Sequence, residues 1–397
     1  YKRRLDNALG KDSVSVDHIE DLHDLGYLPL EIRAVDEGEC VNLRVPLLTI
    51  HNTVDEFFWL TNYIESVLCC FLWKPIASAT IARQYRLLMD KYAEKTADDS
   101  SFVDFQCHDF SFRGMSTPYD AALNGASHLQ FFKGTDCVAS IDLLEDYYDR
   151  NSDNELVGCS VPATEHSVMC MGSKDDEIGT FKRLITEIYP SGIVAIVSDT
   201  WNLWTVLNEY AVELKDEIMN RDGKAVFRPD SGDPETIICG DIDTKKGSLE
   251  YLGCLNILAN NFGYTINKKG YKVLNPKVGL IYGDAITLDR ANSILERMES
   301  MGFSSENIVF GIGAYTYQYV TRDTFGFAIK ATYGEINGKP VNIFKDPKTD
   351  DGLKKSAKGI VSVFKTDTGY GYKDECKSLN VKSELRTVFI NGNLKSL

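Results

Sequence analysis

The sequence has 397 residues and lacks the features that mark several large classes of protein. Its ten cysteines include no C-x-x-C pair and no zinc-finger spacing. Most of them lie in apolar stretches, where a free thiol behaves as a small hydrophobic side chain, and this suits a reducing cytosol. No signal peptide, repeat of solenoid length or low-complexity tract is visible. We therefore expect a cytoplasmic globular protein.

Positive charge and long hydrophobic runs are also scarce. Lys and Arg total 43 against 58 Asp and Glu, which gives a formal net charge of −15. Such a surface repels a polyanion, so we expect no nucleic-acid partner, although a small anionic ligand needs only a pocket. The most apolar run, 57–73, is interrupted by Asn62 and Glu65, so we expect a buried helix and no membrane span.

The composition that is present, 43% hydrophobic and 25% charged, is typical of a folded protein. The length exceeds what one core usually supports, which predicts two domains. Helical patterns cover 54–73 and 77–95, short strands cover 30–35 and 43–50, and hairpin signals occur at Asn337-Gly338 and Asn391-Gly392. We expect a mainly antiparallel sheet domain built from both chain ends, 1–100 and 325–397, and a catalytic domain over 101–324.

The middle of the chain predicts an α/β fold. Four short apolar strands, each followed by helical periodicity, cover 192–199, 224–232, 277–284 and 307–313. This alternation is typical of parallel strands covered on both sides. Their carboxyl ends carry the charged residues Asp199, Arg228, Asp230 and Asp284. A closed β/α barrel gathers such residues on one rim, and we prefer it to an open doubly wound sheet, which would also align its strand ends.

Three shorter segments could carry chemistry, and each also has a structural explanation. In HDFSFRG, Phe110 and Arg113 could hold a flat heterocycle, or serve as core aromatic and structural cation. In FFKGTD, Asp136 could accept a hydrogen bond from an amide, or simply belong to a turn. In VPATEHS, His166 beside Glu165 could act as acid, base or phosphoryl acceptor, or be structural.

Two further segments favour phosphate binding. RPDSGDP places Arg228, Asp230 and Asp233 at a strand end, which is more charge than a turn needs and suits ribose hydroxyls, phosphates and hydrated Mg²⁺. GIGAYTYQYVTRD places glycines before a helix and Arg322 after it, as in a phosphate cradle, but it matches neither Walker A nor G-x-G-x-x-G. Together the segments favour an anionic sugar phosphate, Mg²⁺ and a planar partner.

At this point the sequence resembles a known family. In order, HDFSFRG, FKGTD, VPATEHS, SDTWN, FRPDSGDP, IYGD and GIGAYTYQYVTRD resemble the nicotinamide phosphoribosyltransferases, particularly their bacterial and phage members, from about Pro29 to the C-terminus. The resemblance implies a type II phosphoribosyltransferase fold, an irregular α/β barrel with an antiparallel sheet domain, and a homodimer with shared active sites. It also implies a pentosyltransferase of NAD salvage, which joins nicotinamide to phosphoribosyl pyrophosphate, with Mg²⁺, to give nicotinamide mononucleotide and pyrophosphate.

The resemblance assigns roles residue by residue. Phe110 would stack on nicotinamide, Arg113 would bind its carboxamide, and Asp136 would accept from the carboxamide NH₂. His166 matches a histidine that ATP phosphorylates in an auxiliary reaction, and Asp230 and Asp284 would meet Mg²⁺ directly or through water. The ribose and pyrophosphate–metal unit would be held by Asp199, Arg228, Asp230 and Asp284. The 5′-phosphate would be received by Gly313, Ala314 and Arg322. Other phosphate contacts, some across the dimer interface, would come from Lys330, Lys345 and Lys354. The expected catalytic residues are His166, Arg228 and Asp230.

Two departures from the family pattern leave alternatives open. Ala314 and Tyr315 stand where a triple-glycine phosphate loop has its second and third glycines. The family's N-terminal arm, with a tyrosine and an arginine for the partner's site, has no complete DSYK-type counterpart after Tyr1, so we expect the arm to be absent. The alternatives are a nicotinate phosphoribosyltransferase, which Asp136 disfavours by charge repulsion, and a catalytically weak ligand-binding homologue without the arm.

Overall fold

The computed structural model describes residues 1–345 and 356–395. It divides the chain into two compact units, one formed by Tyr1–Trp73 with Arg322–Leu397 and the other by Lys74–Thr321. The first boundary lies inside helix α4 (Glu65–Thr96), whereas the sequence suggested a boundary near residue 100. The later part of α4 supplies Ala77, Tyr85 and Met89 to the core of the second unit, which explains the difference.

The second unit is built on a six-stranded sheet, with strand order β4-β3-β10-β9-β6-β5. All of its neighbouring strands pair in parallel. Its strands are β3 (Cys107–Asp109), β4 (Gly134–Thr135), β5 (Ser191–Val197), β6 (Asp222–Arg228), β9 (Val278–Tyr282) and β10 (Val309–Ile312). The four predicted strands are thus confirmed as β5, β6, β9 and β10, and the α/β class with them.

The segment 159–164 links the two edges of this curled sheet. Its first residue makes a parallel bridge to Gly134 of β4, and Ala163 makes one to Ala195 of β5. Backbone hydrogen bonds accompany both bridges, from Thr135 N–H to the Cys159 carbonyl at 2.9 Å and from Ala195 N–H to the Pro162 carbonyl at 2.9 Å. The expected irregular β/α barrel is therefore closed by a segment too irregular to count as a strand.

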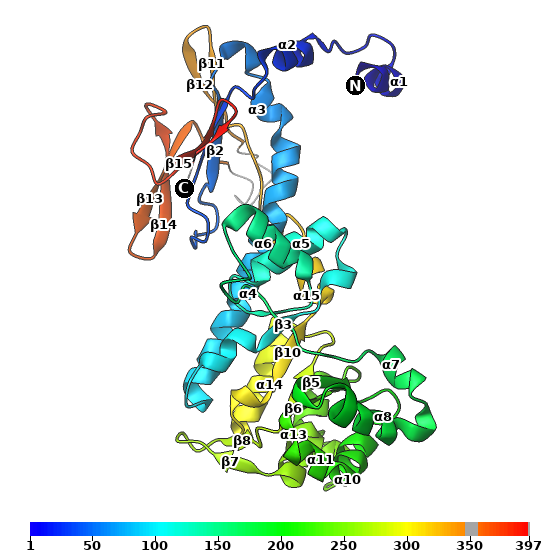
Figure 1. The fold of residues 1–397 in the computed structure, drawn as a ribbon. Helices are drawn as coiled ribbons and strands as arrows, with labels where there is room; N and C mark the ends of the chain where they lie inside the picture. The colour runs from blue at the N-terminus through cyan, green and yellow to red at the C-terminus, as the bar shows by residue number, and fades with distance from the viewer. Residues whose placement is uncertain (346–355, 396–397) are drawn as a thin grey trace. The chain divides into compact units, whose positions relative to one another are not determined.

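Helices cover this sheet. Figure 1 shows β5 and β6 among α8, α11 and α13, and residues of α8, α11, β5 and β6 line one small apolar cavity. The α-helices after α4 are α5 (Pro118–His128), α6 (Val138–Tyr148), α7 (His166–Met171), α8 (Glu177–Arg183), α9 (Leu203–Thr205), α10 (Ala211–Glu213), α11 (Lys215–Asn220), α12 (Pro234–Cys239), α13 (Leu249–Phe262), α14 (Leu288–Ser300) and α15 (Ala314–Gln318). A small hairpin adds β7 (Tyr264–Ile266) and β8 (Lys272–Leu274).

Helix α4 departs from the sequence-based expectation in two ways. It runs through Pro75 as one helix, where we expected two separate helices, although a proline usually breaks a helix interior. Its first part is also not the buried helix expected over 57–73, since Phe58 before it is 71% exposed and Val67 is 57% exposed. By length and composition alone α4 could cross a membrane, but this is weak evidence because its later residues are core residues.

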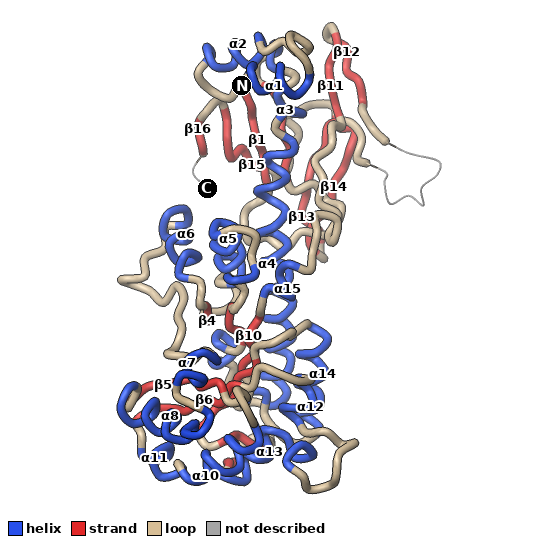
Figure 2. Tube along the Cα trace, turned by 90° about the vertical axis from the view of Figure 1, so that its right-hand side faces the viewer, coloured by secondary structure: helices blue, strands red, loops and turns tan. Residues whose placement is uncertain are grey.

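The other unit contains a four-stranded antiparallel sheet that joins the two ends of the chain. Its order is β16-β15-β1-β2, and Figure 2 shows β16, β15 and β1 next to one another. The strands are β1 (Leu30–Ala34), β2 (Leu48–Asn52), β15 (Arg386–Ile390) and β16 (Asn393–Leu394), with hairpins β11 (Tyr333–Ile336)–β12 (Lys339–Asn342) and β13 (Ile360–Thr366)–β14 (Gly369–Cys376). The helices before α4 are α1 (Lys2–Leu9), α2 (Asp17–Leu25) and α3 (Leu60–Tyr63).

The details of this sheet follow the sequence in most places. Both predicted Asn-Gly turns occur with positive φ at each residue, as two-residue hairpins require. The second predicted strand, 43–50, begins later than expected, at Leu48, because Arg44 has positive φ and breaks the extended chain. Leu30, Phe57 and Leu60 form the core beneath the sheet.

Candidate active site

The candidate site lies at the carboxyl edge of the parallel sheet. Because all six strands run the same way, the residues that end or follow them meet at one edge. These are, in strand order, Asp136 after β4, Phe110 after β3, Gly313 after β10, Asp284 after β9, Arg228 at the end of β6 and Asp199 after β5. The structure thus brings together six residues that the sequence singled out, with Asp230 and His166 beside them.

Phe110 occupies a position that two glycines keep open. A methyl group on Gly311 would overlap the Phe110 ring, and one on Gly283 would lie 2.9 Å from it. The Phe110 N–H donates to the Ile312 carbonyl at 3.0 Å, which fixes the backbone that carries the ring. The Arg228 guanidinium lies 5.9 Å from the ring centroid, within the range of a cation–π contact. The ring is therefore held by the ends of neighbouring strands, as a stacking surface requires.

Asp136 is held by one of its two oxygens. His108 Nε2 lies 2.8 Å from Asp136 Oδ1, and the Ser160 hydroxyl donates to the same oxygen at 2.6 Å. Burial alone would raise the pKa of Asp136, but the bonds from His108 and Ser160 and the charge of Arg228 outweigh it and lower that pKa. Asp136 is thus a carboxylate with one anchored oxygen, and its Oδ2 can accept a hydrogen bond from a ligand.

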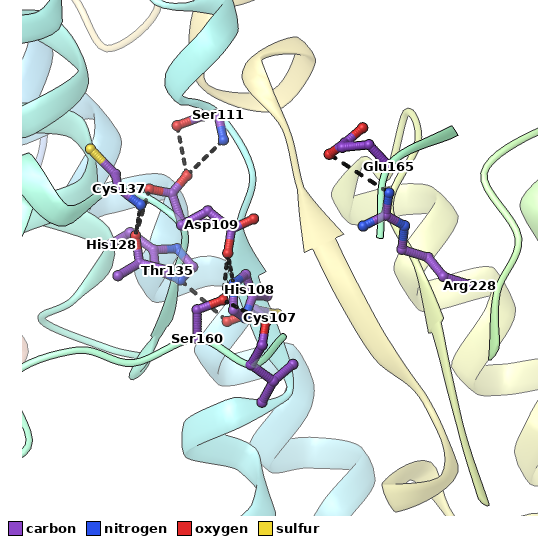
Figure 3. Close-up of polar contacts among 12 residues, drawn as sticks. Cys107, His108, Asp109, Ser111, His128, Thr135, Cys137, Ser160, Glu165 and Arg228 are labelled. Atoms are coloured by element: carbon purple, nitrogen blue, oxygen red, sulfur yellow. Dashed lines mark hydrogen bonds and ion pairs between the residues drawn. The ribbon is translucent and has the colours of Figure 1, made fainter. Parts of the chain in front are cut away.

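A second acid, Asp109, is buried beneath this group and was not singled out from the sequence. Its side chain accepts hydrogen bonds from the Ser111 N–H at 3.0 Å, the Ser111 hydroxyl at 2.6 Å and the Thr135 hydroxyl at 3.3 Å (Figure 3). The Asp136 N–H donates to the Asp109 carbonyl at 3.1 Å. Asp109 therefore ties the segment after β3 to the segment after β4. Nothing in its spacing distinguishes it from an exposed turn residue.

Asp199 accepts hydrogen bonds from the charged turn that follows β6. Its Oδ2 accepts from the Asp230 N–H at 2.8 Å and from the Ser231 hydroxyl at 2.6 Å. Burial raises the pKa of Asp230, and the charges of Asp199 and Asp284 raise it further, while Arg228 and His166 act in the opposite direction. The charged turn that follows β6 is thus folded back onto the end of β5.

Several buried polar atoms at this rim lack a hydrogen bond within the described part of the chain. They are Asp199 Oδ1, Thr200 Oγ1 and Arg228 Nε. His166 Nε2 lies 3.3 Å from Asp199 Oδ1, an ion pair when the histidine is protonated, although the two are not aligned as a hydrogen bond. Buried polar atoms are normally paired, so unpaired donors and acceptors in one place indicate a site for a polar ligand. Thr200 was missed because one hydroxyl in SDTWN carries no spacing signal.

The rim does not form a metal cage from protein groups alone. Among residues 1–345 and 356–395, no three His, Cys, Asp or Glu side chains are grouped so as to hold a metal ion. Mg²⁺, however, usually keeps several waters and takes one or two carboxylates together with substrate phosphates. Asp230 and Asp284, with Asp199 Oδ1, which accepts no hydrogen bond among the described residues, suit a metal ion that arrives with such a substrate.

Glu165 lies between two of the predicted cations. Its carboxylate is 3.7 Å from Arg113 Nη1 and 3.9 Å from Arg228 Nη2, and Figure 3 shows the second contact. Both distances are long for ion pairs, and Arg113 and Glu165 are exposed. In the sequence Glu165 is only the neighbour of His166, because adjacency in the chain does not show which side chains it faces.

Only some of the residues predicted to bind phosphate belong to the same compact unit as the rim. Ala314 begins α15 and packs so closely against Gly114 that a methyl group there would overlap it. Arg322, Lys330 and Lys345 belong to the other compact unit, and Arg322 pairs with Asp323 at 2.9 Å. Lys354 lies outside the described residues. The structure therefore places Gly313 and Ala314 at the described rim, and the phosphate contacts expected of the four cations stay a prediction.

Comparison with known proteins identifies the family of the chain. The model of the nicotinate phosphoribosyltransferase (NAPRTase) family matches residues 105–393. A protein of Acinetobacter baylyi called nicotinamide phosphoribosyltransferase is 56% identical over 401 aligned positions, which cover 99% of this chain and 79% of that protein. Proteins of the same name from Mycoplasma pneumoniae and Xanthomonas campestris are 40% and 35% identical, over 81% and 93% of this chain and 69% and 76% of theirs.

A solved structure supports the fold independently. The crystal structure of nicotinate-nucleotide pyrophosphorylase from Pyrococcus furiosus matches with a TM-score of 0.56, over 96% of this chain and 80% of that one, at 14% identity. A likeness at this identity concerns the fold alone. The family match and the sequence relatives show that the chain belongs to the nicotinate phosphoribosyltransferase (NAPRTase) family.

Proposed function

We propose that this chain is a nicotinamide phosphoribosyltransferase, which transfers the phosphoribosyl group of phosphoribosyl pyrophosphate to nicotinamide in NAD salvage. The observation that carries the proposal is Asp136, a carboxylate at the rim with one oxygen anchored by His108 and Ser160. Phe110 lies beside it on the sheet, with its ring packed against Gly283 and Gly311. The relatives that carry this name are 35–56% identical to the chain.

The charge of Asp136 explains why the amide is preferred to the acid. Nicotinamide presents an NH₂ group that can donate to Asp136 Oδ2, whereas nicotinate presents a second carboxylate and is repelled. The lowered pKa of Asp136 keeps its side chain ionised at neutral pH. Arg113 would then bind the carboxamide oxygen, and Phe110 would stack on the pyridine ring.

The remaining rim residues suit the transfer itself. Loss of pyrophosphate leaves positive charge at the ribose C1, and the leaving group carries negative charge that Arg228 would stabilise. Asp199 and Asp284 would hold ribose hydroxyls, and Gly313 with Ala314 would receive the 5′-phosphate. The pyridine nitrogen is already a nucleophile, so the protein mainly has to align it with C1, and no strong base is needed.

The proposal also includes a Mg²⁺ ion, an auxiliary reaction with ATP and a homodimer. Mg²⁺, held by Asp230 and Asp284 directly or through water, would neutralise the diphosphate. His166, half-exposed and beside Asp199, would accept a phosphoryl group from ATP in the auxiliary reaction. A homodimer with shared sites would cover exposed apolar residues of α4 such as Val67, and would let Lys330, Lys345 and Lys354 act in trans. All ten cysteines are free, as suits the cytoplasm.

The test is product formation from phosphoribosyl pyrophosphate with Mg²⁺ and either nicotinamide or nicotinate. We expect turnover with nicotinamide and little with nicotinate. In Asp136→Asn, which keeps the shape but removes the charge, we expect kcat/KM for nicotinamide to fall by at least about tenfold and the selectivity to collapse. Asp104→Asn, in a partly exposed ion pair with Arg86, is the matched control and should match wild type.

Three outcomes would contradict parts of this proposal. Turnover of nicotinate in preference to nicotinamide would make the chain a nicotinate enzyme and remove the role of Asp136. Binding of both substrates without product would favour a ligand-binding homologue. Equal turnover with MgCl₂ and with excess EDTA would remove Mg²⁺ from the reaction.

The close packing of the Phe110 ring against Gly311 gives a separate prediction. In Gly311→Ala the new methyl group overlaps the Phe110 ring, so the ring must move. We expect KM for nicotinamide to rise about tenfold, because stacking on a displaced ring is lost, while KM for phosphoribosyl pyrophosphate changes much less. Gly334→Ala is the control, because its methyl group would meet Ile343 at an ordinary 3.6 Å. An unchanged KM for nicotinamide would show that Phe110 is not the stacking surface.

A further inference from the structure

A buried hydrogen bond joins the segment after β10 to the strand that precedes Phe110. The Tyr317 hydroxyl in α15 and His128 Nδ1 at the end of α5 are 2.7 Å apart, and neither residue is exposed at all. The other ring nitrogen, His128 Nε2, lies 3.2 Å from the Cys107 carbonyl of β3. Phe132 stacks on the His128 ring at 5.1 Å. A continuous chain of contacts thus runs from Tyr317 through His128 to β3.

The direction of each hydrogen bond follows from the partners. A carbonyl can only accept, so His128 Nε2 carries the proton and donates to Cys107. His128 Nδ1 is then an acceptor, and the Tyr317 hydroxyl donates to it. Burial lowers the pKa of His128 and raises that of Tyr317, so both stay neutral. The arrangement therefore does not change over the neutral pH range.

The two elements that this pair connects carry different parts of the candidate site. Strand β3 leads into Phe110, and its His108 bonds Asp136. Helix α15 follows Gly313 directly and begins with Ala314. The strands themselves pair only along three positions, from Phe310 with Cys107 to Ile312 with Asp109. Because this pairing is so short, the additional side-chain link through Tyr317 and His128 restricts how far the ends of β3 and β10 can shift relative to each other.

Other contacts fix the same helix from other sides. The Thr316 hydroxyl donates to the Ile286 carbonyl at 2.7 Å, and Lys74 donates to the Tyr317 carbonyl and to Gln318 Oε1. These contacts hold α15 against α4 and the segment after β9. Unlike these contacts, the Tyr317–His128 hydrogen bond leads to β3, through the Cys107 carbonyl.

We infer that Tyr317 and His128 are a positioning pair, which sets the distance between the base-binding strand β3 and the phosphate-binding segment after β10. The inference rests on the proposed function, because it assigns the base to one element and the 5′-phosphate to the other. The expected role is alignment of the pyridine nitrogen with the ribose C1, which small displacements strongly impair. Neither residue touches substrate.

The test separates alignment from stability. In Tyr317→Phe, which removes only the hydroxyl, we expect kcat to fall about tenfold while both KM values change less than about threefold. In His128→Asn, whose side-chain oxygen can still accept from Tyr317 but whose link to Cys107 is lost, we expect a similar fall in kcat. In the double variant Tyr317→Phe/His128→Leu, the apolar pair should restore much of the melting temperature without restoring kcat.

Tyr92→Phe is the matched control. It removes a buried tyrosine hydroxyl that bonds Asn292 at 3.2 Å, away from the rim, and should leave kcat unchanged. Wild-type turnover in the same assay tests the proposed function by itself. With that turnover present, wild-type kcat in either His128→Asn or Tyr317→Phe overturns the positioning pair alone. So does a fall in kcat that the double variant recovers together with its stability.

Discussion

Replacing Arg228 with alanine is expected to lower kcat/KM for phosphoribosyl pyrophosphate by about 10³-fold. The Arg228 side chain is 7% exposed, its Nε has no hydrogen-bond partner among the described residues, and it faces Phe110 and Glu165. The alanine variant loses both the charge that we propose stabilises the leaving pyrophosphate and the contact with the Phe110 ring. Steady-state kinetics with varied phosphoribosyl pyrophosphate at saturating nicotinamide measures the effect.

Two further variants show whether this loss is chemical or structural. Arg228→Lys keeps the charge but not the planar fork, so an intermediate loss is expected. Arg221→Ala removes another buried arginine, just before the other end of β6, where it bonds the carbonyls of Tyr189 and Gly192. That control should lower the melting temperature with little change in kcat/KM. If Arg221→Ala and Arg228→Ala reduce activity equally, Arg228 has no special role in the transfer.

Replacing Glu177 with glutamine is expected to stabilise the protein at pH 8 by about 3 kcal/mol. Glu177 is 3% exposed and its Oε1 has no hydrogen-bond partner among the described residues. Burial raises the pKa of Glu177 from 4.5 to about 7. Between these values the folded state holds a proton that the unfolded state has lost, so stability falls as pH rises and is lowest above pH 7. Glutamine carries no charge and avoids this cost.

The pH dependence is the decisive part of this measurement. Thermal unfolding should show an increase of about 4–6 °C for Glu177→Gln at pH 8. The gain should fall below about 1 kcal/mol at pH 5, where the wild-type carboxyl is protonated in the folded state. Glu187→Gln, on an exposed residue of the same region, should change nothing at either pH. A gain for Glu177→Gln that is equal at both pH values would rule out ionisation as its cause.

The strands that could be predicted are those with a continuous apolar run. Strand β5 has Val194 to Val197 buried in succession, and the run ends at a charged residue, so its position is clear from the sequence. Strands β3 and β4 have three and two residues, too few for any pattern. The place of β3 in the sheet depends on pairing with β10, some 200 positions later in the chain, and β4 pairs in turn with β3. Local sequence cannot reveal such pairing.

The site could be predicted for residues that end strands, and less well for residues that support them. Asp136 and Asp109 are both acids near short strands, yet the first faces the rim and the second is buried beneath it. The partners His108, Ser160 and Thr135 matter because of contacts across the fold, which spacing does not encode. Pro75 gave a misleading signal, because the tertiary contacts of α4 outweigh its local tendency to break the helix.

The pairing of β1 with β15 has a consequence for synthesis on the ribosome. Strand β1 lies between β15 and β2, and Glu31 pairs with Ile390 near the end of the chain. One edge of β1 therefore stays without its partner until β15, some 360 positions later, has emerged, and such edges invite pairing with other nascent chains. Contacts of this sequence separation also form slowly. We expect the unit that contains this sheet to fold last, and to depend most on chaperones before β15 has paired with β1.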